Sequence, residues 1–452
     1  MVCAVLAAAM GFGLSAQQAP RATLFEGARL LTGEPAPPIE NSAMLVENGR
    51  ITRVGRRGDI PPPQGAARVN LTGKTVMPAL VDTHNHLGWT DHKTGIATPT
   101  TFNREIVIDH LRRYAYFGFA AANSLGLDRW NVDPNMPYTL RSEVIPNAAR
   151  FLTAGRGIAA APTAGPLQEY RVGVPYGAET EAEGRARVQA MKARDVEMIK
   201  IWVDSRQGTV PKLEVRVYEA IIDEAHKNGM RVVAHIFNLE DAKQLLTSGI
   251  DGFAHTVRDR DVDDEYLALV KQHPKVWTGP NLPVRALSIQ DTSAQIDWIA
   301  DTVPPSQVTA MRAALAARQK AAAPTKAEAD AAALFAVQCR NLRKVHDAGM
   351  VLGLGTDGNA DIGWGGHAEL ADMVFCGLSP AEAIVAGTKT SAELLKLNDL
   401  GTIAPGKSAD FIVRDANPLD NILNTRKINA VYLRGSTVDR QALSRGFRTE
   451  AR

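Results

Sequence analysis

Eight short apolar runs, each able to form a β-strand, alternate with helical patterns through the middle of the chain. The runs are VMPALVDTH, FGFAAANSLG, ARFLTAGRG, VEMIKIWVD, MRVVAHI, DGFAHTV, KVWTGPN and MVLGLGTD. Alternation of this kind is typical of a parallel sheet covered by helices, and eight repeats match the (β/α)8 TIM barrel. A doubly wound sheet is the competing architecture, but no phosphate-cradling glycine-rich fingerprint follows the first run. The sequence therefore predicts an α/β fold with a (β/α)8 barrel over residues 78–387.

Both ends of the chain have a different pattern, in which short β-rich pieces are separated by turns. The stretch VENGRI (46–51) places Asn-Gly between two strand-like runs, which is a strong hairpin signal. Near the other end, ADFIVRD and INAVYLRG follow a Gly/Pro turn region. We expect residues 21–77 and 388–440 to combine into one small β-sandwich domain. Added helices are expected around residues 287–343, between the last two barrel strands, where they could act as a lid.

The first 20 residues contain no charge and hold a short Ala-rich apolar run followed by Leu14-Ser15-Ala16. This is the pattern of a secretory signal peptide, except that a basic n-region is missing. We therefore expect residues 1–20 to be a signal peptide and the protein to be periplasmic or secreted, with the cytoplasm as the alternative. The apolar run is shorter than the roughly 20 residues that cross a bilayer, so a stable membrane span is not expected.

Charge and cysteine content indicate which binding partners and which cysteine-based sites are not expected. Lys plus Arg is 51 and Asp plus Glu is 49, and the resulting net charge of +2 gives no reason to expect nucleic acid. Cys3, Cys339 and Cys376 are too few for a disulfide framework and match no zinc motif, so we expect packing residues. Small neutral or mixed-charge partners are expected, and the sequence leaves a homo-oligomer open.

Histidines and one aspartate stand at the ends of several apolar runs. In VDTHNHL, His84 and His86 are two residues apart and so face the same way on a strand. His235, His255 and Asp357 end the fifth, sixth and eighth runs, at the barrel face where active sites form. Taken singly, each histidine could be a packed or loop residue and Asp357 a helix N-cap. Together they predict a metal site, because zinc takes imidazole and carboxylate ligands.

Lys200 lies within MIKIWVD, a run that has the composition of a fully buried strand. Burial of an unpaired ammonium group lowers its pKa from about 10.4, which makes a neutral amine available. Such an amine could capture carbon dioxide and become a carbamate, an anionic ligand able to bridge two cations. The alternative is an ordinary ion pair with Asp204 or Asp357.

The order of these motifs resembles the amidohydrolase superfamily. VDTHNHL, IKIWVD, VVAHI, FAHTV, GTDGN and the closing GTIAPGKSADFIV follow one another as they do there, and the chain is most similar to the imidazolonepropionase-like and prolidase-like group. The resemblance covers about Ala22 to Gly435. Two departures are Ala79, where the family usually has glycine, and VVAHIFN, which leaves the substrate preference open.

The resemblance implies a binuclear site with two divalent cations, for which zinc is the expected metal. A hydroxide that bridges the cations would attack an amide carbonyl, and Asp357 would pass its proton to the departing nitrogen. Asp357 and Lys200 would therefore be catalytic. The implied ligands are His84, His86 and Asp357 for the first cation, His235 and His255 for the second, and carboxylated Lys200 as the bridge.

Residues that could bind a substrate carboxylate are less specific. Arg206, Arg258 and Arg285 follow the fourth, sixth and seventh runs, and His367 lies in WGGH after the eighth. A bidentate arginine contact would suit a carboxylate, although a solvated loop position is the simpler explanation for each of these residues. Of the remaining histidines, His92 is a candidate partner of the first motif. The others are expected at the surface; they are His110, His226, His273 and His346.

We expect a metal-dependent hydrolase that cuts an amide bond, in a dipeptide of the Xaa-Pro kind or in an N-acyl amino acid. A mononuclear cyclic-amide hydrolase of the imidazolonepropionase kind, or a deaminase, would leave Lys200 as a plain amine. A lactonase or phosphotriesterase would use the same cations. A catalytically silent barrel scaffold is the non-enzyme alternative, and the presence of all six ligand residues disfavours it.

Overall fold

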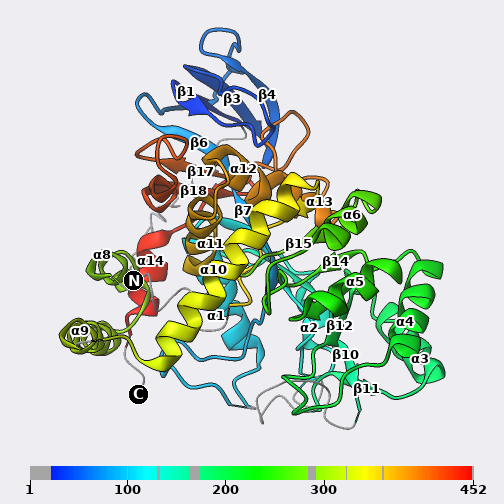
Figure 1. The fold of residues 1–452 in the computed structure, drawn as a ribbon. Helices are drawn as coiled ribbons and strands as arrows, with labels where there is room; N and C mark the ends of the chain where they lie inside the picture. The colour runs from blue at the N-terminus through cyan, green and yellow to red at the C-terminus, as the bar shows by residue number, and fades with distance from the viewer. Residues whose placement is uncertain are drawn as a thin grey trace, which may run out of the picture.

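The computed structural model describes residues 22–98, 100–129, 133–161, 173–282, 292–321, 323–358 and 361–449. Arg285, one of the substrate-binding candidates, and Cys3 lie outside these residues, as does the expected signal peptide. Strands from both chain ends lie at the top of Figure 1, and helices surround a second group of strands below them.

Two sheets at the top of the molecule are built from strands of the N-terminal and C-terminal segments (Figure 1). The four-stranded sheet has the order β4-β3-β1-β5, with β1 (Ala22–Glu26), β3 (Ser42–Glu47), β4 (Arg50–Arg56) and β5 (Ala67–Asn70). The five-stranded sheet has the order β19-β18-β17-β6-β2, with β2 (Arg29–Leu30), β6 (Thr75–Pro78), β17 (Phe411–Arg414), β18 (Ile428–Leu433) and β19 (Ser436–Thr437). The N- and C-terminal segments thus share one sheet.

The hairpin expected at Asn48-Gly49 is confirmed. β3 and β4 are antiparallel partners, and both turn residues have positive φ, 50° for Asn48 and 76° for Gly49. Asn and Gly tolerate this left-handed conformation better than other residues, so the local sequence is sufficient to set the turn. One apolar core then joins the two sheets, with Phe25 packed 5.1 Å from Phe411 between ring centroids.

The second group of strands forms two parallel sheets. The seven-stranded sheet has the order β11-β10-β12-β13-β14-β15-β16, and the three-stranded sheet has the order β7-β8-β9. Their bounds are β7 (Leu80–Asn85), β8 (Phe119–Ser124), β9 (Arg150–Thr153), β10 (Ile158–Ala160), β11 (Tyr176–Ala178), β12 (Ile199–Val203), β13 (Val232–Ile236), β14 (Gly252–Phe253), β15 (Trp277–Thr278) and β16 (Val351–Leu352).

Backbone hydrogen bonds connect both edges of the three-stranded sheet, β7 and β9, to the seven-stranded sheet. The N–H of Thr83 in β7 donates to Leu354 O beyond β16 at 2.8 Å, and the N–H of Glu197 before β12 donates to Thr153 O in β9 at 3.1 Å. The arrangement is a TIM-barrel-like α/β fold. Each of the eight apolar runs contains a strand, whereas the short strands β10 and β11, rich in Ala and Gly, were not predicted.

Helices cover these sheets because each helix has one apolar face, which it buries against the strands. In α4, buried Val217, Ile221 and Ala225 follow one another at four-residue intervals, which places them on a single face. The flanking helices are α1 (Arg104–Tyr116), α2 (Met136–Leu140), α3 (Glu181–Lys192), α4 (Val215–Lys227), α5 (Leu239–Thr247), α6 (Asp264–Gln272), α11 (Trp364–Phe375), α12 (Pro380–Val385), α13 (Ser391–Leu394) and α14 (Arg440–Phe447), with short helical turns η3 (Ala386–Thr390) and η4 (Ile422–Arg426).

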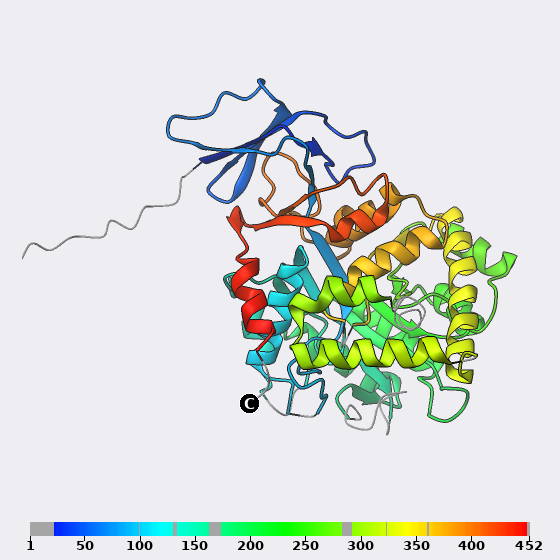
Figure 2. The same ribbon diagram turned by 90° about the vertical axis from the view of Figure 1, so that its left-hand side faces the viewer.

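Additional helices lie between β15 and β16, as the sequence predicts. They are α8 (Ser293–Ile299), η2 (Ala300–Thr302), α9 (Pro305–Lys320) and α10 (Lys326–Asp347). The helix α9 has no buried residue, and in Figure 2 the lime-green helices α8 and α9 lie across the front of the helical part.

The expectation that Cys339 and Cys376 are packing residues is wrong. The two sulfur atoms form a disulfide that connects α10 to the C-terminal end of α11. The cysteines are 37 positions apart in the sequence, and their Cα atoms come within 4.6 Å only because the two helices pack together. Spacing along the chain could not reveal this contact.

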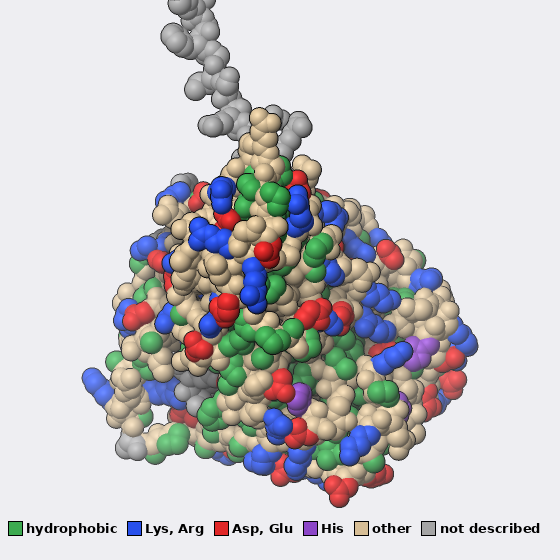
Figure 3. Space-filling model, turned by 90° about the horizontal axis from the view of Figure 1, so that it is seen from above, with side chains coloured by type: hydrophobic (Ala, Val, Ile, Leu, Met, Phe, Trp, Pro, Cys, Tyr) green, Lys and Arg blue, Asp and Glu red, His purple; other side chains and the backbone are tan. Residues whose placement is uncertain are grey.

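The surface carries both signs of charge. Figure 3 shows Lys and Arg side chains interspersed with Asp and Glu side chains over the face at the top of Figure 1. Among the described residues, no helix combines the length and the apolar composition needed to cross a bilayer.

His110 and His92 are buried, so the expected surface position of His110 is wrong. Nδ1 of His110 accepts a hydrogen bond from the N–H of Gly88 at 3.1 Å, and its Nε2 lies 2.7 Å from Thr90 O. The ring of His92 packs edge-on against His110 at 4.8 Å. His92 therefore supports the segment after β7, and its ring contact is with His110, not with His84 or His86.

The buried His110 makes stability sensitive to acid. Burial lowers the pKa of His110 from 6.5 to about 4, so the imidazole is neutral in the folded protein. The stabilisation that depends on the neutral ring is complete above pH 6.5 and is lost as pH falls toward 4. The loss in the free energy of unfolding is at most about 3 kcal/mol. We expect His110→Gln, which can still donate to Thr90 O, to show a flatter pH dependence. Urea unfolding at pH 7.5 and 5 measures this; parallel curves for both proteins would contradict it.

Candidate metal centre

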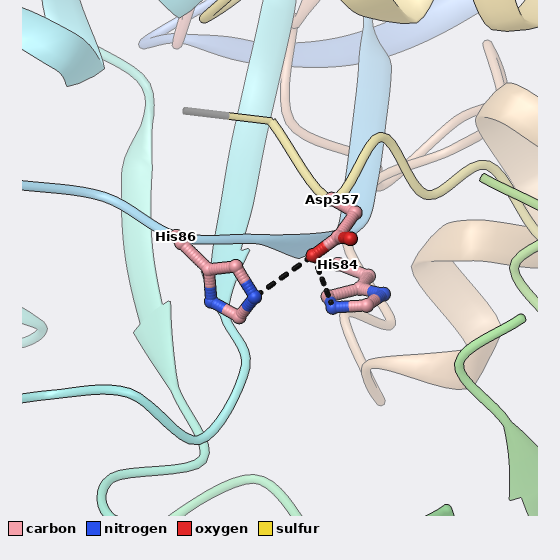
Figure 4. Close-up of side chains that lie close together, drawn as sticks. All are labelled: His84, His86 and Asp357. Carbon is pink, nitrogen blue, oxygen red and sulfur yellow. Dashed lines mark ion pairs between the residues drawn. The ribbon is translucent and has the colours of Figure 1, made fainter. Parts of the chain in front are cut away.

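The first three candidate ligands lie together at the edge where β7 borders the segment after β16. His84 is in β7, His86 follows it, and the N–H of Asp357 donates to His84 O at 2.7 Å. One carboxylate oxygen of Asp357 lies 3.3 Å from Nε2 of His84 and 2.8 Å from Nε2 of His86 (Figure 4). The ligand atoms of these three residues all lie within 4.8 Å of one another.

The backbone of Asp357 explains how its carboxylate reaches both rings. Its φ is 52°, in the left-handed region that few residues other than Gly, Asn and Asp adopt readily. Such conformations are concentrated at functional sites. The helix N-cap alternative for Asp357 is wrong, because the next helix, α11, begins at Trp364 with Gly363 as its cap.

The second pair of histidines continues the same cluster. His235 is in β13, and His255 follows β14 in the neighbouring position of the sheet. Their ring centroids are 4.6 Å apart, and the ring of His255 is 5.4 Å from that of His84. Nε2 of His255 lies 4.0 Å from the second carboxylate oxygen of Asp357. The four imidazoles and the carboxylate are therefore contiguous.

Lys200 lies on β12, beside the strand that carries His235. Its side chain is 1% exposed, and no hydrogen-bond partner of Nζ is found among the described residues. Its stem packs tightly, because the backbone of Gly126 approaches so closely that a Cβ there would lie 2.6 Å from Lys200 Cγ. Burial lowers the pKa of Lys200 to about 7, although Asp357 acts in the opposite direction.

The ion-pair alternative for Lys200 is not found in the structure. Among the described residues, no carboxylate oxygen lies within 4.0 Å of its Nζ. Asp204, the first suggested partner, instead lies 3.2 Å from Nε2 of His235. Within the part of the chain that the structure describes, the lysine is therefore a buried amine with no compensating anion at contact distance.

The residues fit a divalent cation. Among the described residues, no hydrogen-bond partner is found for the buried atoms His255 Nδ1 and Lys200 Nζ, an arrangement that is costly unless a ligand satisfies them. Burial lowers the pKa of His84, His255 and His235, the last to about 4, so these rings keep the lone pair that a metal ligand needs. Imidazole with carboxylate is a donor set for zinc and similar metals.

Asp82, in the same motif as His84 and His86, stabilises the site through a buried hydrogen-bond network. It is fully buried and accepts hydrogen bonds from Tyr114 Oη at 2.6 Å, Thr356 Oγ1 at 2.7 Å and the N–H of His84 at 3.0 Å. Burial raises the pKa of Asp82 to about 7. Because Thr356 precedes Asp357, this network joins β7 to the segment after β16 that carries Asp357.

Replacing Asp82 with alanine should destabilise the protein. Tyr114 and Thr356 would keep buried hydroxyl groups without acceptors, at about 1–3 kcal/mol each. We expect a total loss of about 2–5 kcal/mol in the free energy of unfolding, measured by urea denaturation. Asp415→Ala is the control, because Asp415 pairs with Lys74 at the surface and its loss should change stability by less than about 1 kcal/mol. Equal effects of the two substitutions would contradict this role of Asp82.

The candidates for substrate binding differ in burial. Arg258 is buried, donates to Ile236 O at 2.8 Å, and lowers the pKa of Lys200, His235 and His255, so its charge acts on the cluster. Arg206 is exposed to solvent in the loop after β12.

The structure also corrects the position expected for His367. It is buried in α11, where its Nε2 lies 2.8 Å from Phe117 O and its ring contacts Phe117, Phe119 and Trp298. This aromatic packing, not the cluster of site histidines, is its environment. Its glycine-rich flank allowed a loop interpretation, but the segment is helical.

Two contacts of the site were not foreseen. Nδ1 of His84 lies 3.1 Å from Oδ1 of Asn281, and Asp204 holds His235 as described above. Asp204 has a local signal, since it ends the MIKIWVD run at the same sheet edge as the ligands. Asn281 has none, because the loop geometry after β15 alone brings it to His84.

Fold and site together define an α/β protein with a candidate metal centre. An imidazolonepropionase of Deinococcus radiodurans is 26% identical over 440 residues, covering 92% of this chain and 99% of that protein. Among solved structures, a Xaa-Pro dipeptidase with bound methionine has a TM-score of 0.71 at 20% identity, covering 92% and 99%. An ochratoxinase of A. niger has a TM-score of 0.70 at 19% identity, covering 92% and 95%.

The chain belongs to the amidohydrolase family, whose model matches residues 75–438. It is a hydrolase acting on carbon–nitrogen bonds, and it resembles the imidazolonepropionase-like and prolidase-like members.

Proposed function

We propose that the protein is a binuclear amidohydrolase that cleaves the amide bond of a dipeptide of the Xaa-Pro kind or of an N-acyl amino acid. The observation that carries the proposal is the buried Lys200, which has no contacting anion among the described residues and whose charge acts on His84, His235 and Asp357. A plain ammonium group in this position would be costly, whereas a carbamate would be satisfied by two cations.

The ligands divide into two groups. His84 and His86 with Asp357 would hold one cation, His235 and His255 the other, and carboxylated Lys200 would bridge them. Zinc is the proposed metal. Bound cations of this kind polarise a carbonyl and acidify water.

The protein's own residues supply proton transfer and substrate binding. Asp357 would accept a proton during attack on the carbonyl and deliver it to the departing nitrogen. The buried Arg258 is the best-placed candidate for binding a substrate carboxylate, because its charge acts on the His235 and His255 side of the cluster. Arg285 and the exposed Arg206 are weaker candidates for this contact.

Metal analysis combined with a substrate screen tests the proposal. We expect about two divalent cations per chain by elemental analysis, and turnover of Xaa-Pro dipeptides or N-acyl amino acids by the zinc-loaded protein. Amidated substrates, which lack the free carboxylate, should show a raised KM. A metal-loaded protein that binds two cations but hydrolyses no member of the panel would refute the substrate class.

A mononuclear cyclic-amide hydrolase is the second candidate. It is favoured by the fact that His84, His86 and Asp357 already form a compact group, and by the similarity to an imidazolonepropionase. One cation per chain, full activity without Lys200 and turnover of cyclic amides would support it.

The finer architecture is also proposed. We infer that the two parallel sheets close into a complete (β/α)8 barrel over residues 78–387, and that residues 21–77 and 388–440 form a β-sandwich. Limited proteolysis tests these boundaries. Residues 287–343 would be the first region cleaved inside the barrel segment, since α9 has no buried residue.

We further propose that the protein is exported to the periplasm or secreted. The disulfide between Cys339 and Cys376 supports this, because such bonds persist in oxidising compartments and are rare in the cytosol. Fractionation of the source cells and thiol labelling of the isolated protein test it. Residence in the cytoplasm with two free thiols would refute it.

A further inference from the structure

Two of the metal-binding candidates have hydrogen-bond partners on opposite ring nitrogens. Nδ1 of His84 lies 3.2 Å from the carbonyl oxygen of Ala254 and 3.1 Å from Oδ1 of Asn281. A carbonyl oxygen only accepts, so Nδ1 of His84 carries the proton. The lone pair of its ring is therefore on Nε2, the nitrogen nearest to Asp357.

His235 has the reverse arrangement. Its Nε2 lies 3.2 Å from Oδ2 of Asp204, while Oδ1 of Asp204 accepts the N–H of Arg206 at 2.9 Å. An ionised carboxylate has no proton to donate, so Nε2 of His235 carries the proton and Nδ1 carries the lone pair. Asp204 is buried at 8% exposure, which excludes most competing water.

Both partners are themselves held in place. Asp204 directly follows β12, and His235 lies opposite Trp202 on the adjacent strand. On the other side, Glu369 of α11 accepts the N–H of Leu282 at 2.8 Å, which fixes the segment that carries Asn281. Asn281 has a φ of 57°, a conformation that suits Asn.

We propose that Asp204 and Asn281 are positioning residues that fix opposite tautomers on His235 and His84, so that His235 presents Nδ1 and His84 presents Nε2 to a cation. The proposal rests on the metal-dependent function given above and adds two residues to it. A carboxylate or amide oxygen that holds the far nitrogen of a ligand histidine orients the ring and makes it a better ligand.

The test measures cation affinity and ring protonation in the full-length protein. Zinc affinity is measured by competition with a chromophoric chelator, and tautomers by ¹⁵N spectra of the metal-free protein with labelled histidine. His84→Gln and His235→Gln assign the signals. We expect Nε2–H for His235 and Nδ1–H for His84.

Each partner has its own variants. Asp204→Asn should weaken the cation held by His235 by about 10–100-fold and give mixed tautomers for that ring. Asn281→Gly, which tolerates the positive φ, should weaken the cation held by His84, and Asn281→Asp should restore much of the affinity because it again offers an acceptor. Asp251→Asn is the matched control, since Asp251 pairs with the more exposed His226 at 2.8 Å; it should leave zinc affinity unchanged.

Unchanged affinity in Asp204→Asn and Asn281→Gly, or wild-type rings protonated on the opposite nitrogens, would overturn the proposal. These readouts do not depend on turnover. If both cations bind, the variants weaken them and no amide is hydrolysed, the positioning role stands and the proposed substrate class fails.

Discussion

Replacing Lys200 with alanine is expected to lower amide hydrolysis at least about 10³-fold, or about 4 kcal/mol in the activation free energy. The reason is that the buried amine on β12, once carboxylated, would be the ligand shared by the two proposed cations. Elemental analysis should show the loss of one cation per chain. Short carboxylic acids such as acetate, added at high concentration, should restore part of the activity by entering the space that the side chain leaves.

Two further variants separate chemistry from folding. Lys200→Met fills a similar volume without a charge and should be inactive. Its metal-free form should be no less stable than the metal-free wild type, because the buried amine is removed. Lys212→Ala removes a partly exposed lysine that pairs with Asp241, and it should keep full activity. Wild-type turnover in Lys200→Met would show that the lysine has no role in catalysis.

Asp357→Asn is expected to reduce kcat by about 10²–10⁴-fold, because asparagine cannot carry a proton to the departing nitrogen. Asparagine accepts the left-handed backbone at φ 52° as readily as aspartate does, so the fold should be unchanged. The measurement is a series of N-acyl amides with leaving groups of different basicity. The loss should be greatest for alkylamine leaving groups and smallest for p-nitroaniline, which departs without prior protonation.

The leaving-group series also tests the role itself. If the Asn variant lost the same factor with every leaving group, Asp357 would act only as a metal ligand. Asp415→Asn, at the surface, should change no rate and serves as the control.

Much of the fold could be predicted because strand signals are local. The apolar runs VVAHI and IKIWVD each formed a parallel strand, and Asn48-Gly49 formed the expected turn. Local patterns did not predict strands made of small residues or contacts between positions far apart in the sequence. The short β10 and β11, made of Ala, Gly and a few others, have no periodicity, and the disulfide depends on how α10 and α11 pack.

Burial was the other property that local patterns predicted incompletely. Lys200 was expected inside because its neighbours are apolar on both sides. His110 was expected outside because a surface position is the default for a histidine in a helical or loop segment, yet it faces the segment after β7 and is fully buried. The direction in which a helix faces depends on the sheet beneath it, and the charged neighbours did not reveal that direction.

The sequence by itself determined which residue types end which strands, because two-residue periodicity and the run of apolar side chains act within a few positions. It therefore established that His84 and His86 share a face and that Lys200 lies in a buried strand. Only the tertiary structure decided that Asp357 meets those histidines, that Asp204 contacts His235 and not the lysine, and that Asn281 reaches His84. These contacts join positions up to 273 apart (357 minus 84), and strand order and loop geometry set them through packing of the whole chain.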